Sequence, residues 1–359
     1  MADCCRLCGF PDVTLFHRGL RVRSVLVGAA RRPLSALRST LRMREVMMSI
    51  GFTHIPHIED NTPMFLSKLG LLERTCFGQI VVGTPHSTRE NIALAAEIVR
   101  RTTSVRVVVA VAPTDILPVD AASAITELDR ASDGRISVRL VSAQATPSCH
   151  VAAVQQMDEF VVLLKRLWSN DRPISHEGRF YRLEDAYLPL KGPQGASIPL
   201  WTAGASGTSR QFAGRHANVA ELMPGSPDTV AEEIARVRTT AGQFGRANKI
   251  RFVLPVEAGD SGTDAGQASA VDAVRIGGTA AEMVTALHPY VSAGVSEFAI
   301  AGLNGYASIS GFSWQVAPLL RNRNAVDGHR QNIAGTLLTV PHSQFEHRQD
   351  VSRAARRSH

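Results

Sequence analysis

The chain has no long apolar run, and by that criterion it has no membrane-spanning helix. Its longest apolar stretches, such as Val105–Pro113, are far shorter than the ~20 residues that a bilayer requires. Cysteine is scarce as well: there are five cysteines in 359 residues, and three of them lie close together near the start. An odd, crowded set of this kind is not a disulfide framework, so we expect a protein of the reducing cytoplasm.

Aromatic residues are few, 6% of the chain, and they are not interleaved with the basic residues as in a nucleic-acid groove. The net charge of +7 arises largely from arginines near the two ends, and basic ends are usually solvated. We therefore expect no nucleic-acid partner. We divide the chain into a basic irregular N-terminal segment (1–45), a folded domain (46–322) and a basic polar C-terminal tail (323–359).

A metal site is not expected either. Cys5 and Cys8 have CxxC spacing, but a zinc site needs a second ligand pair, and none lies within reach in the sequence.

From about residue 46 onward, short β-rich apolar segments alternate with amphipathic helical segments. This alternation predicts a parallel sheet covered by helices. We expect eight strands, at residues 47–55, 79–82, 106–111, 136–141, 198–202, 219–222, 251–256 and 297–300. Eight strand and helix pairs predict a (β/α)₈ TIM barrel. A doubly wound open sheet is the alternative, since periodicity alone does not show closure. A short hairpin around Glu177-Gly178 is expected as an insertion before the fifth strand.

A turn of small residues follows the fifth strand and leads into a helix: Gly204, Ala205, Ser206, Gly207 and Thr208. Unpaired backbone N–H groups and the helix dipole make a helix N-terminus suitable for an anion. Glycine and alanine let a phosphate approach, and the hydroxyl groups can donate hydrogen bonds. The alternative is ordinary helix capping, for which Gly and Ser are also common.

Several segments, taken together, resemble the bacterial luciferase-like flavin monooxygenases, in particular the alkanesulfonate monooxygenase branch. The most specific are LDRASDGR at 128–135 and HEGRFY at 176–181. Weaker matches include PLW at 199–201 with GAS at 204–206, and GGTA at 277–280. All of them occur in family order between about residues 51 and 320.

This resemblance implies an FMN-using TIM barrel that receives reduced flavin from a separate reductase and uses O₂ to oxygenate a small organic substrate. Relatives commonly form homo-oligomers. The chain departs from the family at Thr88, where a cysteine is expected, and at Val253, where a histidine is expected. A short loop at 259–266 also replaces a long lid. These departures make sulfonates doubtful substrates. They keep two rivals open: a deazaflavin (F420)-dependent oxidoreductase of the same superfamily, and a non-catalytic barrel that acts as a binding protein.

The resemblance and the barrel fold together name cofactor-binding candidates, because TIM-barrel sites lie at the carboxyl ends of the strands. The turn 204–208 is expected to hold the phosphate. Ser142 and Gln144 follow the fourth strand, where relatives contact the flavin, although Gln144 can instead cap its own loop. Ala112 follows the third strand and offers a small apolar surface to the flavin ring, which a plain core strand would also do.

Three residues are candidates for the chemistry. His54 ends the first strand and His86 follows the second, and an imidazole titrates near neutrality, which suits proton transfer. Arg251 matches a family arginine, and the resemblance implies that it steadies an anionic substrate or an oxygenated intermediate.

Overall fold

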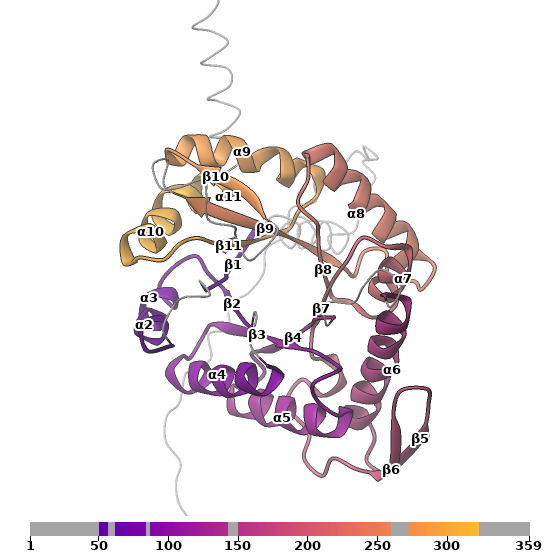
Figure 1. Ribbon diagram of the computed structural model, residues 1–359. Coiled ribbons are helices and arrows are strands. Elements are labelled where there is room, and N and C mark those ends of the chain that lie inside the picture. Colours follow the sequence, from indigo (N-terminus) through magenta and orange to yellow (C-terminus); the bar gives the residue numbers. More distant parts are fainter. Residues whose placement is uncertain (1–49, 57–61, 84–86, 143–149, 260–272, 323–359) are drawn as a thin grey trace, which may run out of the picture. The chain divides into compact units, whose positions relative to one another are not determined.

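Eight parallel strands close into a barrel in the computed structural model (Figure 1). The structure describes residues 50–56, 62–83, 87–142, 150–259 and 273–322. The strands of the ring are β1 (Gly51–His54), β2 (Gln79–Val82), β3 (Arg106–Val111), β4 (Ile136–Leu140), β7 (Leu200–Ala203), β8 (Val219–Glu221), β9 (Arg251–Gly259) and β11 (Glu297–Ala301). Each pairs with its neighbours in parallel, and β8 pairs with β9 to close the ring. The predicted TIM barrel is confirmed, and the open sheet is excluded.

Helices lie outside the ring (Figure 1); most of them connect consecutive strands, and the last two follow the final strand. They are α2 (Thr62–Ser67), α3 (Leu69–Leu72), α4 (Thr88–Arg101), α5 (Pro118–Ala131), α6 (His150–Ser169), α7 (Gly207–His216), α8 (Pro227–Gly242), α9 (Ala280–Ala293), α10 (Tyr306–Gly311) and α11 (Ala317–Arg321). A 3₁₀ turn, η2 (Gly195–Ser197), precedes β7, and a π-helical turn, η3 (Phe312–Val316), joins α10 to α11.

The strand predictions differ from the structure at β1, predicted at 47–55 and observed at Gly51–His54, and at β9. This strand continues to Gly259 rather than ending at 256, and a further strand, β10 (Val274–Gly277), pairs in parallel with its end. β8 pairs with Arg251–Val253 and β10 with Val256–Gly259, so both lie along the same edge of β9. The sequence did not predict β10. The predicted short lid at 259–266 falls almost entirely outside the described residues.

An antiparallel hairpin, β5 (Ile174–Glu177) with β6 (Arg182–Ala186), stands at the position expected for the insertion. The Glu159 carboxylate of α6 holds its turn: it accepts hydrogen bonds from the N–H groups of Phe180 (3.2 Å) and Tyr181 (3.0 Å) and lies 3.0 Å from His176 Nε2. Part of the HEGRFY motif therefore fastens the hairpin to α6.

The LDRASDGR motif forms the turn that connects α5 to β4. Asp133 (φ 52°) and Gly134 (φ 80°) adopt the left-handed conformation that reverses the chain. Arg135 then donates to the carbonyl oxygens of Thr102 (2.8 Å) and Val105 (2.6 Å), which lie between α4 and β3. Five donors in a fixed fork allow one arginine to fasten several carbonyls at once.

Strand side chains alternate between two apolar layers. Residues that point outward pack under the helices and form the main core, while a smaller cluster fills the barrel interior. The interior cluster consists of Val81, Val108, Trp201, Val219, Val253 and Ala299, with Ile55 against it.

Candidate functional site at the carboxyl ends of β4, β7 and β8

The turn after β7 gives α7 an open N-terminus. Gly204 has φ +118°, and a Cβ there would come within 2.9 Å of the Ser209 side chain, so this position requires glycine. Ser206 is the N-cap and accepts a hydrogen bond from the Ser209 N–H at 3.0 Å. A Cβ at Gly207 would meet nothing within 4 Å. There is therefore free space in front of the first helical N–H groups.

Hydroxyl groups and one histidine surround this helix start. Ser206 Oγ lies 3.0 Å from Thr208 Oγ1 and 2.8 Å from Ser209 Oγ. His150 opens α6, and its Nε2 lies 2.7 Å from Ser206 Oγ and 3.2 Å from Ser209 Oγ. N–H groups, hydroxyls and an imidazole are the donors that a phosphate needs, so this donor set fits the phosphate of a nucleotide cofactor. His150 was not among the candidates from the sequence, although it begins the helix that follows β4.

An ion pair in the barrel interior joins the two strands that flank β7. Arg139 on β4 donates from Nε and Nη2 to the two carboxylate oxygens of Glu221 on β8, each at 2.7 Å. The side chains are 15% and 13% exposed. Burial lowers the pKa of Arg139, but the charge and hydrogen bonds of Glu221 outweigh it and raise this pKa above its usual value. Arg139 therefore carries its positive charge permanently.

One buried N–H donor in this part of the interior has no acceptor. Trp201 on β7 is in register with Arg139, and its buried Nε1 has no hydrogen-bond partner. Arg139, beside it, uses Nε and Nη2 for Glu221. A buried unpaired donor costs about 1–3 kcal/mol, so an acceptor from water or a ligand would stabilise this region.

Of the other cofactor-binding candidates, Ala112 and Ser142 lie within the described residues. Ala112 is buried directly after β3, and its N–H donates to Thr88 Oγ1 at 3.0 Å. Thr88, at the position of the expected cysteine, is thus engaged by the backbone of the β3 loop. Ser142 follows β4 and is exposed, and Gln144 lies outside the described residues.

His54 does not point into the barrel. Its neighbour Thr53 donates to the inward-facing Glu297, so His54 faces outward, where its ring packs edge-on against Phe77 with centroids 5.5 Å apart. It is 2% exposed and its Nδ1 has no hydrogen-bond partner. Burial, with a smaller effect of the charge on Lys68, lowers the pKa of His54 to about 3. The structure therefore does not bring His54 to the mouth, contrary to expectation. His86 lies outside the described residues.

Arg251 lies at the opposite end of the barrel from the expected site. It is the first residue of β9, and its Nη1 lies 3.3 Å from Glu297, the first residue of β11. Glu297 is 1% exposed and also accepts hydrogen bonds from Thr53 and from Gln79 Nε2, the latter at 2.5 Å. Arg251 thus belongs to a polar cluster at the amino ends of the strands, which corrects its expected position near the substrate.

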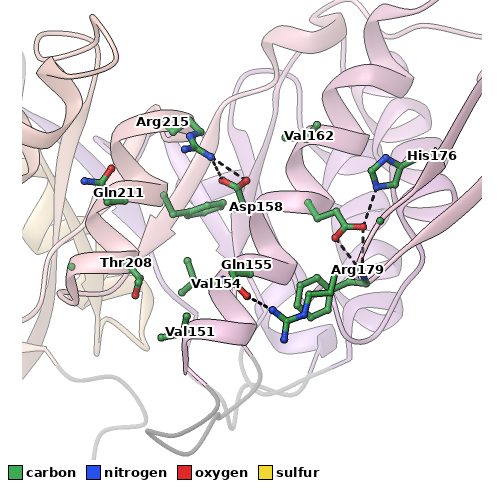
Figure 2. A pocket seen from close by; sticks show the side chains of 15 residues that line it. Val151, Val154, Gln155, Asp158, Val162, His176, Arg179, Thr208, Gln211 and Arg215 are labelled. Carbon is green, nitrogen blue, oxygen red and sulfur yellow. Dashed lines mark hydrogen bonds and ion pairs between the residues drawn. The ribbon is translucent and has the colours of Figure 1, made fainter.

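A groove of about 660 Å³ lies outside the barrel wall, between α6, α7 and the β5–β6 hairpin (Figure 2). Val151, Val154 and Val162 line it along one face of α6, and Gly207 and Thr208 form one end. It therefore touches the phosphate candidate, but most of it lies away from the strand ends.

The charged groups of this groove are largely paired. Asp158 lies 3.2 Å from Arg215, Glu159 contacts His176, and Arg179 donates to Gln155 at 2.8 Å (Figure 2). Because active sites of TIM barrels lie at the strand ends, we place the candidate site at the mouth rather than in the groove.

Within the described ranges, no cluster of three or more His, Cys, Asp or Glu side chains is positioned to hold a metal ion. None of the helices described here is both long and apolar enough to cross a bilayer.

The described part of the chain is thus a closed parallel TIM barrel with an open helix N-terminus at the carboxyl end of β7. The family model for luciferase-like monooxygenases matches residues 69–301, and the chain belongs to this family.

Solved structures with the same fold include a monooxygenase, the protein DmoA and an F420-dependent enzyme. The long-chain alkane monooxygenase LadA has a TM-score of 0.66 at 15% identity, covering 77% of this chain and 92% of its own. DmoA from Hyphomicrobium sulfonivorans has a TM-score of 0.65 at 15% identity, covering 77% and 89%. An F420-dependent secondary alcohol dehydrogenase, in complex with an F420-acetone adduct, has a TM-score of 0.64 at 17% identity, covering 77% and 100%. At such identities these likenesses show the fold alone.

Proposed function

We propose that this chain is a cytoplasmic monooxygenase that binds reduced FMN, supplied by a separate reductase, and uses O₂ to oxygenate a small organic substrate. The observation that carries the proposal is the open start of α7, at the carboxyl end of β7 in a luciferase-like barrel. Bound reduced FMN supplies the electrons that activate O₂. We expect a homo-oligomer, as in relatives.

The protein's own residues bind and orient the cofactor in this proposal. Ser206, Thr208 and the first N–H groups of α7 donate hydrogen bonds to the phosphate, and His150 adds a further donor. The flavin ring would then lie over the mouth, on the side of Ala112 and Ser142, and Gln144 stays a candidate from the sequence alone. His86 remains the candidate for proton transfer from the sequence alone, since it lies outside the described residues.

The second candidate is an F420-dependent oxidoreductase, which would transfer hydride without consuming O₂. The same phosphate-binding turn serves it, and the F420-dependent alcohol dehydrogenase shares the fold.

Anaerobic titration with reduced FMN and with reduced F420, followed by addition of O₂, tests the proposal. We expect FMN to bind and the complex to consume O₂. Preference for F420 without O₂ uptake would support the second candidate, and failure to bind either cofactor would favour a non-catalytic binding protein.

A further inference from the structure

The Arg139–Glu221 ion pair lies where a ligand held by the β7 turn would enter the barrel. The strand order is β4-β7-β8, so the strand that carries the phosphate-binding turn runs between the two strands that carry the pair. Ala203 is in register with Glu221 and has only a methyl group, which leaves room for the arginine to reach across β7. A ring that dips into the mouth from Ser206 would therefore meet this pair.

The geometry of the pair fixes the guanidinium. Two bonds of 2.7 Å to both oxygens of one carboxylate hold its plane, and the strands at both ends are rigid. One donor nearby, the buried Nε1 of Trp201, has no acceptor in the part of the chain that the structure describes. This combination is typical of a site prepared for a hydrogen-bond acceptor.

We propose that Arg139, held in place by Glu221, stabilises the negative charge of the reduced flavin ring and so sets the reduction potential of the bound cofactor. The inference rests on the proposed FMN binding. The pyrimidine part of a reduced flavin is electron-rich and carries acceptor atoms, and a positive charge close to it favours the reduced form. Charge interactions are strong in this setting because both side chains are about 85% buried, as their exposures show.

The proposal predicts opposite effects for the two members of the ion pair. Removing the positive charge in Arg139→Met weakens binding of reduced relative to oxidised FMN. Removing the negative charge in Glu221→Gln leaves the charge of Arg139 uncompensated. This change strengthens binding of reduced relative to oxidised FMN. A simple structural role would disturb both forms of the cofactor equally and would not give effects of opposite sign.

The experiment measures the reduction potential of protein-bound FMN by spectroelectrochemistry. For Arg139→Met we expect the ratio of affinities for reduced over oxidised FMN to fall about tenfold, or about 30 mV for a two-electron couple. Glu221→Gln should raise the ratio, and Arg139→Lys, which keeps the positive charge, should keep it within about threefold of the wild type. Arg251→Ala is the matched control, since it removes an arginine from an Arg–Glu pair at the other end of the barrel.

Unchanged ratios in Arg139→Met and Glu221→Gln, with oxidised FMN still bound, would overturn the inference and leave the proposed function intact. Absence of FMN binding by the wild type would instead overturn the proposed function. Should Arg139→Met fail to fold, the same criterion is applied to Glu221→Gln and to the double variant Arg139→Met/Glu221→Met, in which no charge is left unpaired.

Discussion

The Nε2 atom of His216 lies 3.0 Å from Oδ1 of Asp158 and joins the last residue of α7 to the middle of α6. On the other side of the ring, Lys165 Nζ lies 3.3 Å from Nδ1. The neutral imidazole satisfies both neighbours, since it donates to the carboxylate and accepts from the ammonium. The contact fixes the two helices whose N-termini form the candidate phosphate site.

This histidine should make stability depend on pH. Burial, followed by the charge of Lys165, lowers the pKa of His216 to about 4, against the attraction of Asp158. Between pH 6.5 and about 4 the unfolded chain binds a proton that the folded chain does not. The free energy of unfolding should therefore be greatest above pH 6.5 and fall as the pH decreases toward 4.

Urea denaturation across this pH range measures the effect. His216→Gln should be less stable at neutral pH but should lose less stability on acidification. Some pH dependence should remain, because the pKa of His54 is also lowered, to about 3, and acts in the same direction. A His216→Gln variant with the full wild-type pH dependence would show that this ring is not the titrating group.

The two glycines of the β7 turn should separate folding from cofactor binding. Gly204→Ala forces a Cβ toward Ser209 at positive φ and should destabilise the protein by about 1–3 kcal/mol. Gly207→Ala meets no neighbour, so its Tm should be unchanged, yet its methyl group projects into the space in front of the helix start and should weaken FMN binding. Thermal denaturation and FMN titration of both variants provide the check. Wild-type FMN affinity in Gly207→Ala would place the phosphate elsewhere.

Arg251 and Glu297 should affect stability unequally and cofactor binding not at all. The Arg251 side chain is 54% exposed, so Arg251→Ala should cost no more than about 1 kcal/mol. Glu297→Ala leaves the buried donors of Thr53 and Gln79 without an acceptor and should cost about 3 kcal/mol. Denaturation curves and FMN titrations of both variants test this prediction. A large loss of FMN affinity in Arg251→Ala would show that this arginine does contribute to the cofactor site.

His54 offers a direct test of its outward position. His54→Leu removes an unsatisfied buried nitrogen and keeps apolar contact with Phe77, so the folded protein should keep its stability within about 1.5 kcal/mol and its full affinity for FMN. Loss of oxygen uptake by the FMN complex in a well-folded His54→Leu variant would contradict the conclusion that His54 faces outward, away from the active site.

The strand pattern predicted the fold well because most β segments are short, mainly apolar runs between amphipathic helices. β2 and β3 were predicted with their observed bounds. The four-residue strand β10 was missed, since it contributes no apolar run of its own and only extends the edge of β9.

The site was less predictable, because strand periodicity does not show which end or face a residue occupies. Arg251 opens its predicted strand, which already placed it at the amino end, but the family resemblance favoured a substrate role. His54 lies in a strand that is apolar on both faces, so its direction required the register with β11. Arg139 and Glu221 had a detectable signal: each is a charged residue within an apolar strand, and a buried charge needs a partner. The sequence does not show that these two residues pair.

Comparison of FMN with riboflavin, which lacks the phosphate, tests the account most directly. Fluorescence titration of the wild type and of Ser206→Ala gives the four dissociation constants. We expect the wild type to bind FMN at least about tenfold more tightly than riboflavin, as charge-assisted hydrogen bonds to the phosphate require, and Ser206→Ala to lose most of that difference. Equal affinity of the wild type for FMN and riboflavin would contradict a phosphate site at the start of α7.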